Sequence, residues 1–340
     1  MTKDFVKIVT AGLFANKAGA MLLRPLWRGR STVFVLHRLN APSTPDSMSL
    51  ENIAANLNAL RKAGARFVSL SYLVDLAVRG LDLEPGCVAF TIDDGYADQG
   101  VMAKRAFADN GVPVTMFLIT GLIDGTLWPW DHRVDYALRN SPRSSIRFAP
   151  TGTTLWLVTP EQRNAAVEAV QVYCKTIPSH EVDAVLEAVF AAAAVHPPER
   201  PPESQRPLTW DEVRELEAAG VDFAPHSITH SITSKLAAQD VRQEIQGSWD
   251  RLKKELSHPV PIYAWPTGRS GDFSERDLEI AANVGMLAAV SVTNDYARIR
   301  PTGRASLPSL DRFSMSPSPL ETIQYGTGLE RLKQIVRSGW

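Results

Sequence analysis

The chain has 340 residues, which is enough for one large α/β domain or two smaller ones. Its 44% hydrophobic and 21% charged residues are ordinary for a soluble globular protein, and a formal net charge of −1 argues against a nucleic-acid partner. The two cysteines, Cys87 and Cys174, lie far apart and share no motif spacing, so no disulfide framework is predicted.

Residues 1–30 are predicted to form an N-terminal helical segment. The stretch MTKDFVKIVTAGLFANKAGA has early lysines, a semi-apolar middle and an A-x-A-like ending, which is a partial signal-peptide pattern. Because Lys7, Asn16 and Lys17 interrupt the apolar part, an amphipathic helix is favoured, lying on the domain or in peripheral contact with a membrane. No apolar stretch is long enough to span a bilayer. The expected location is therefore the cytoplasm, ahead of the periplasm or secretion.

Short apolar runs alternate with helical patterns through most of the chain. The predicted strands are 32–37, 87–93, 112–120, 221–226, 261–266 and 286–292, and the predicted helices are 49–63, 97–110, 210–219, 237–256 and 274–283. Such alternation predicts a mostly parallel sheet, open or closed as a barrel, with the active site at the carboxyl ends of the strands.

Residues 126–206 interrupt this alternation. The segment opens with LWPWDHRVDYALRN, continues through an alanine-rich helical pattern around 160–194 and ends in the proline-rich HPPERPPESQRP. We interpret it as an inserted helical subdomain with a proline-rich linker back to the main domain. The main domain would then consist of 31–125 and 207–340.

Two adjacent aspartates, Asp93 and Asp94, follow the buried strand FTI and precede a glycine. Adjacent strand residues point to opposite faces, and two like charges this close raise each other's pKa. The plain alternative is a turn with solvated carboxylates, because Asp-Gly is common turn chemistry. The two adjacent aspartates have a functional explanation if a cation binds beside them, because its positive charge offsets the repulsion between their carboxylates.

A second motif, APHSITHS, supplies His226 and His230. The spacing of four would place both imidazoles on one face of a helical turn, which suits two nitrogen ligands of one metal ion. The better-known zinc helix carries a glutamate after the first histidine, but this chain has Ser227 there, so a base must come from elsewhere. One aspartate of the pair can complete a His-His-Asp site, and the other can remain unbound as the base.

Three motifs together resemble a known family. FTIDDGYAD, HSITH and YAWPTG occur in the order found in the polysaccharide deacetylases, carbohydrate esterase family 4 with its NodB-like domain. LTWDEVRELEAAGVDFAPHSITH is also similar to the helix and strand that lead into the family's histidine motif. The resemblance covers about 32–125 and 207–315.

This resemblance implies a deformed (β/α)7-type barrel and one divalent metal, most often Zn2+, with Co2+, Ni2+ or Mn2+ as alternatives. By position, Asp93 matches the catalytic base, and the metal ligands are Asp94, His226 and His230. The backbone N–H of Thr267 in the PTG loop matches an oxyanion donor.

The chain departs from the commonest family pattern in two places. YAWPTG has no arginine before its proline, and no histidine follows His258 to serve as the usual general acid. Both features resemble the poly-N-acetylglucosamine deacetylase-like branch, in which an N-terminal histidine and a late arginine take these roles. VLHRLN then supplies His37 as the acid, and SLPSLDRFSM supplies Arg312 as the partner of the base, with Arg304 as the alternative. The competing interpretations are a core-packed His37 and a surface Arg312 paired with Asp311.

Residues of the LWPWDH stretch, together with Tyr96 after the two aspartates, are candidates for the sugar site. Aromatic faces pack well on pyranose rings, and the candidates are Trp128, Trp130, Asp131 and Tyr96. The alternative for the tryptophans is that they anchor the inserted subdomain to the barrel.

The predicted function is metal-dependent removal of an N-acetyl or other small N-acyl group from an amino sugar. The substrate could be a polysaccharide, a lipid-linked oligosaccharide or a sugar precursor. Two alternatives remain open: an inactive sugar-binding protein on the same scaffold, and a hydrolase of a non-sugar C–N amide bond. The sequence leaves the oligomeric state undetermined.

Overall fold

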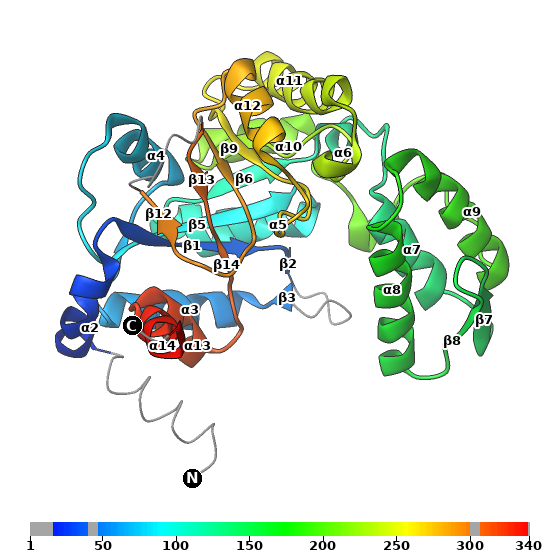
Figure 1. Ribbon diagram of the computed structural model, residues 1–340, viewed down its shortest axis with the longest axis horizontal. Helices are drawn as coiled ribbons and strands as arrows, with labels where there is room; N and C mark the ends of the chain where they lie inside the picture. Colours follow the sequence, from blue (N-terminus) through cyan, green and yellow to red (C-terminus); the bar gives the residue numbers. More distant parts are fainter. Residues whose placement is uncertain (1–15, 40–46, 300–306, 339–340) are drawn as a thin grey trace, which may run out of the picture.

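The computed structural model describes residues 16–39, 47–299 and 307–338 (Figure 1). Within these ranges, no helix combines the length and apolar character needed to cross a bilayer. Only the later part of the predicted N-terminal segment is described, as α2 (Lys17–Leu23) and the 3-10 helix η1 (Arg24–Trp27).

The centre of the molecule is a curled sheet of parallel strands. Its main strands, in spatial order, are β1 (Arg30–Leu36), β5 (Cys87–Asp94), β6 (Thr115–Leu118) and β9 (Asp222–Pro225). Two short strands add to this sheet: β4 (Arg66–Phe67) pairs parallel with the start of β5, and β12 (Ala297–Arg298) pairs antiparallel with β1. A separate pair is formed by β2 (Arg38–Leu39) and β3 (Ser47–Met48).

A second parallel sheet continues the curve with β10 (Ile262–Ala264), β11 (Ala288–Val290) and β13 (Ser309–Leu310). On one side, the Val260 N–H donates to the Phe223 carbonyl at 2.7 Å and links the two sheets. On the other side, β14 (Phe313–Ser314) follows β13 and pairs parallel with β1. These strands form a curled, mostly parallel sheet that is consistent with the expected deformed barrel, and the predicted fold class is confirmed.

Helices cover the outside of this barrel (Figure 1). They are α3 (Leu50–Lys62), α4 (Leu70–Arg79), α5 (Ala97–Met102), α6 (Thr120–Ile123), α10 (Trp210–Ala218), α11 (Ala238–Glu255), α12 (Glu275–Val284), α13 (Pro319–Gly326) and α14 (Leu329–Ser338). A π-helical turn, η2 (Ala103–Phe107), and a 3-10 turn, η3 (Ala108–Asn110), complete the helix predicted over 97–110, and a further 3-10 turn is η6 (Thr233–Lys235). Thr209 and Glu212 form a capping box at the start of α10.

Strand alternation divides the buried residues between two faces. Phe34, Phe90 and Phe223 point outward into the cluster under the surrounding helices. Residues one position earlier or later point into the barrel, where small side chains such as Ala89 and Ala224 leave a narrow interior. The same alternation carries Thr91 and Asp93 to the inner face, because they follow Ala89 at steps of two.

The segment 126–206 stands to one side of the barrel, drawn in green in Figure 1. It contains α7 (Trp130–Arg139), β7 (Ser145–Phe148), β8 (Thr153–Trp156), α8 (Pro160–Cys174), η4 (Ser179–Glu181), α9 (Val182–Ala193) and η5 (Glu203–Gln205). Its buried residues form a cluster of their own that includes Val134, Val170 and Leu186. The boundaries assigned from the sequence stay predictions.

Two details of this segment differ from the expected pattern. The helical stretch around 160–194 is two helices, because the chain turns at Pro178 between α8 and α9. The antiparallel hairpin β7–β8 has no counterpart among the predicted strands. Cys174 is buried in this segment and Cys87 in β5, and both are free thiols.

Candidate active site

The end of β5 explains how two adjacent aspartates reach one cavity. Asp93 follows the strand alternation and points into the barrel. Asp94 has a left-handed backbone, with φ of 94°, which ends the alternation and is costly for a residue that is not glycine. Both carboxylates consequently line the same cavity instead of opposite faces of the sheet.

Arg312 holds Asp93 with two parallel hydrogen bonds. Its Nη1 and Nη2 donate to Oδ1 and Oδ2 of Asp93, each at 2.7 Å. Nη1 also donates to Thr91 Oγ1 at 3.0 Å, and Nε donates to the Ser291 carbonyl at 3.1 Å. The guanidinium lies 5.5 Å from the centre of the Phe117 ring. Since the Arg312 side chain is 0% exposed, the interpretation as a surface residue paired with Asp311 is wrong.

This pairing decides the charge of Asp93. Burial by itself would raise the pKa of the carboxyl, but the charge of Arg312, followed by smaller effects of His226 and the Arg312 hydrogen bonds, lowers the pKa to about 2. Asp93 is therefore ionised and fixed in orientation at neutral pH. Arg304, the alternative partner, lies outside the described residues.

The two histidines converge, but not on a helical turn as the spacing predicted. His226 follows β9, and the chain then forms a loop in which Ser227 and His230 have φ of 69° and 60°. Ser227 Oγ accepts a hydrogen bond from the His230 N–H at 2.8 Å, and this closes the loop. The left-handed residues bring the rings together with centroids 5.0 Å apart, so the four-residue spacing serves the site through a loop and not through a helix.

Glu244 of α11 holds residues 226–230, the histidine loop, through three hydrogen bonds. Its carboxylate accepts the N–H groups of Ile228 and Thr229 at 2.8 and 2.9 Å and the Thr229 hydroxyl at 2.8 Å. Sequence analysis missed this residue, because it is one of many charged residues on an amphipathic helix. No signal in the sequence distinguishes it from its solvated neighbours.

Asp94, His226 and His230 together form a candidate divalent-metal site. Their ligand atoms lie within 4.8 Å of one another, and Asp94 Oδ1 is 3.8 and 3.9 Å from Nε2 of His226 and His230. Nδ1 of His226 lies 2.9 Å from the Ala264 carbonyl, so this nitrogen donates and Nε2 keeps a free lone pair. Burial, and to a smaller extent His230, lowers the pKa of His226 to about 4, which keeps the ring neutral as a ligand must be. Two imidazoles and one carboxylate are the donor set of a catalytic metal site with open positions.

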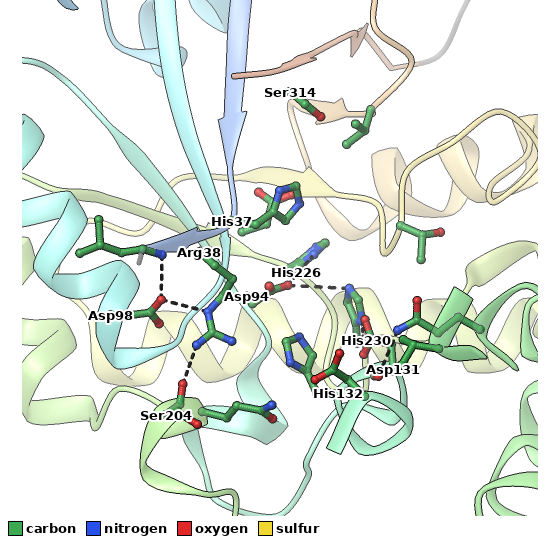
Figure 2. A pocket seen from close by; sticks show the side chains of 18 of the residues that line it. His37, Arg38, Asp94, Asp98, Asp131, His132, Ser204, His226, His230 and Ser314 are labelled. Atoms are coloured by element: carbon green, nitrogen blue, oxygen red, sulfur yellow. Dashed lines mark hydrogen bonds and ion pairs between the residues drawn. The ribbon is translucent and has the colours of Figure 1, made fainter. Parts of the chain in front are cut away.

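A cavity of about 820 Å³ contains these groups and is lined by both the barrel and the inserted segment (Figure 2). His37, directly after β1, lines it and is half-buried, so it is not packed away in the core. The charge of His37 contributes to lowering the pKa of Asp93, after larger effects of Arg312 and His226. His132 also lines the cavity, although the sequence singled it out in no motif.

Thr267 lines the same cavity at the mouth of the barrel. Its φ of 58° is left-handed, and its hydroxyl donates to the Asp272 carboxylate, which also accepts the Arg269 N–H. The Thr267 backbone N–H has no acceptor among the described residues. A free, rigidly held donor is what an oxyanion requires.

Three of the four residues assigned to a sugar site lie elsewhere. Trp128 and Trp130 line a separate cavity behind the histidine loop, where Trp128 Nε1 donates to Gln205 Oε1 at 2.9 Å. Tyr96 is fully buried, with its ring 4.8 Å from that of His132 and beneath the Arg38 guanidinium. These three residues do not line the main cavity, because Trp128 and Trp130 pack within the inserted segment and Tyr96 packs against His132. Their assignment to a sugar site stays a prediction.

Asp131 does line the main cavity, and it lies beside a metal-ligand candidate. Its Oδ1 is 4.0 Å from Nδ1 of His230. Burial would raise the pKa of Asp131, but the charges of His132, His230 and Lys175 lower it below the usual value. The residue therefore presents a negative charge to the outer side of the His230 ring.

The curled barrel thus carries a candidate Asp-His-His metal site beside a separate carboxylate that Arg312 holds. The polysaccharide deacetylase family model matches residues 81–289, and the chain belongs to this family. No protein with a curated description matches the sequence.

Several solved structures share the fold at low identity. IcaB from Ammonifex degensii is 17% identical over 88% of this chain and 97% of its own, with a TM-score of 0.57. The deacetylase PplD from Streptococcus pyogenes, solved with acetate, is 16% identical over 90% and 97%, with a TM-score of 0.55. A de-N-acetylase from Aggregatibacter actinomycetemcomitans is 16% identical over 87% and 99%, with a TM-score of 0.51.

Proposed function

We propose that this protein is a zinc-dependent N-deacetylase that removes the acetyl group from an N-acetylated amino sugar in a glycan or its precursor. One observation carries the proposal. A carboxylate held ionised by Arg312 stands in the same cavity as the buried ligands Asp94, His226 and His230. Family membership supports amide or ester hydrolysis on carbohydrates, and the site adds the metal ligands and the base.

Each side chain has a defined task in this proposal. A divalent ion held by Asp94, His226 and His230 would supply Lewis acidity at the acetyl carbonyl and lower the pKa of water. Asp93 accepts the proton of the attacking water, and Arg312 keeps its carboxylate ionised and oriented. The Thr267 N–H donates to the developing oxyanion, and His37 donates the proton that the leaving amine needs.

The same observations weigh against one of the two alternatives. An inactive sugar-binding protein has no need of a charged pair buried beside an intact metal triad, because such a pair is expensive to bury. A non-sugar amide would fit the same chemistry, and substrate profiling separates it from a glycan. We also propose a cytoplasmic precursor substrate, on the interrupted apolar pattern around Lys7, Asn16 and Lys17.

The test is acetate release from N-acetylglucosamine oligomers and from nucleotide- and lipid-linked N-acetylamino sugars. The protein should be inactive after chelation and active after zinc is restored. Asp93→Asn should bind zinc with the wild-type stoichiometry and lose about 10²–10⁴-fold in kcat. Zinc-loaded wild type that releases no acetate from any of these sugars would refute the proposal.

A further inference from the structure

The outer side of the His230 ring carries an unusual pair of polar atoms. Nδ1 of His230 and Oδ1 of Asp131 are both buried, and neither has a hydrogen-bond partner among the described residues. The two atoms lie 4.0 Å apart, while Nε2 of the same ring lies 3.9 Å from Asp94. The imidazole thus stands between two carboxylates, one from the barrel and one from the inserted segment (Figure 2).

Buried polar atoms are nearly always hydrogen-bonded, so two unpaired atoms that face each other need an explanation. A small rotation of either side chain shortens 4.0 Å to a hydrogen bond, in which Nδ1–H donates to the carboxylate. The other histidine shows what this contact would accomplish. Nδ1 of His226 is held by the Ala264 carbonyl, and this fixes its tautomer and ring orientation.

In the part of the chain that the structure describes, no backbone carbonyl accepts a hydrogen bond from Nδ1 of His230. Its own N–H is occupied by Ser227 Oγ, and that contact positions the backbone but not the ring. Asp131 is the acidic group placed at the free nitrogen, and it lies in the first turn of α7. A carboxylate in that position would both orient the ring and increase the electron density available at Nε2.

We propose that Asp131 is a positioning residue for His230, so that the inserted segment completes the metal site of the barrel. This inference depends on the metal site of the proposed function, but it does not depend on which substrate the protein uses. It replaces the earlier assignment of Asp131 to sugar contact with a role in metal affinity. Helix α7 then acts as a part of the site's support, beyond forming one wall of the cavity.

The experiment measures metal affinity without substrate. Wild type, Asp131→Ala and Asp131→Asn are titrated with Zn2+ and Co2+ against a chelator of known affinity, and the visible spectrum of the cobalt-loaded protein is recorded. Asp135→Asn is the matched control, because Asp135 lies one turn further along α7, lines the same cavity and pairs with Arg139 at 2.6 Å.

Asp131→Ala should bind both ions about 10- to 100-fold more weakly and shift the cobalt spectrum. Asp131→Asn should lose less affinity, because its amide oxygen still accepts the Nδ1 proton but carries no charge. Asp135→Asn should match wild type in both measurements.

Unchanged affinity and an unchanged cobalt spectrum in Asp131→Ala would overturn the inference while leaving the deacetylase proposal intact. If Asp131→Ala does not fold, wild-type affinity and spectrum in Asp131→Asn would overturn it equally. If the wild-type protein binds neither Zn2+ nor Co2+, that result would instead refute the proposed function. If Asp131→Ala raises KM and leaves the metal affinity unchanged, Asp131 contacts the sugar and does not position His230.

Discussion

Arg312 and Asp93 are 219 positions apart in the sequence, and their side chains form two hydrogen bonds of 2.7 Å inside the barrel. Each group depends on the other, because a buried charge without its partner is strongly unfavourable. Arg312→Met should therefore lower the free energy of unfolding of the metal-free protein by about 3–5 kcal/mol, measured by urea denaturation.

The matched control is the double variant Asp93→Asn with Arg312→Met. It removes both charges, so it should be more stable than Arg312→Met alone, and the cycle should show a coupling energy above about 1 kcal/mol. Strictly additive effects would show that the pair contributes no coupling to stability.

His37→Ala should depress kcat by about 10²–10⁴-fold with little change in KM, because the residue is assigned to proton donation and not to binding. His132→Ala is the informative comparison, since His132 lines the same cavity. A larger loss of kcat in His132→Ala than in His37→Ala would transfer the acid role to His132.

Glu244→Gln should weaken both the fold and the metal site. The carboxylate accepts three hydrogen bonds from the histidine loop, and an amide provides only one oxygen and no charge. We expect a loss of about 1–3 kcal/mol in unfolding free energy and weaker zinc binding in a chelator titration. Asp250→Asn, on the exposed side of the same helix, should change neither. Wild-type zinc affinity in Glu244→Gln would mean that the loop holds its shape without this carboxylate.

The Asp222 carboxyl gives a pH-dependent prediction away from the site. Burial raises its pKa, and a weaker contribution from the Ser71 hydroxyl opposes the rise. A raised pKa in the folded state means that ionising Asp222 costs stability, which is lost as the pH rises from the unfolded pKa through the folded one.

Asp222→Asn should accordingly be more stable than wild type at pH 7, by up to about 0.5 kcal/mol, and the advantage should vanish below the unfolded pKa of roughly 4. Urea denaturation between pH 4 and 7 measures this difference. The exposed Asp75→Asn serves as the control, since Asp75 pairs with Arg79 at the surface. An advantage that grows on acidification would contradict the assignment.

The sequence predicted those features that depend on local patterns. The apolar run at 87–93 predicted β5, the helical pattern at 210–219 predicted α10, and the order of motifs predicted that Asp93, Asp94, His226 and His230 lie together. The turn at 226–230 could not be predicted, because the same four-residue spacing occurs in a helix and in this left-handed loop. The placement of Trp128 and Tyr96 could not be predicted for a similar reason: an aromatic side chain can face a ligand or a neighbouring segment, and only tertiary packing decides.

Arg312 also occupies a telling position in the topology, between β13 and β14, the two short strands that close the ring against β11 and β1. A nascent polypeptide still lacking this segment on the ribosome would hold its metal-binding residues but no counterion for the buried carboxylate. Under the proposed function, the base and its counterion would therefore come together only once the last part of the barrel has been synthesised.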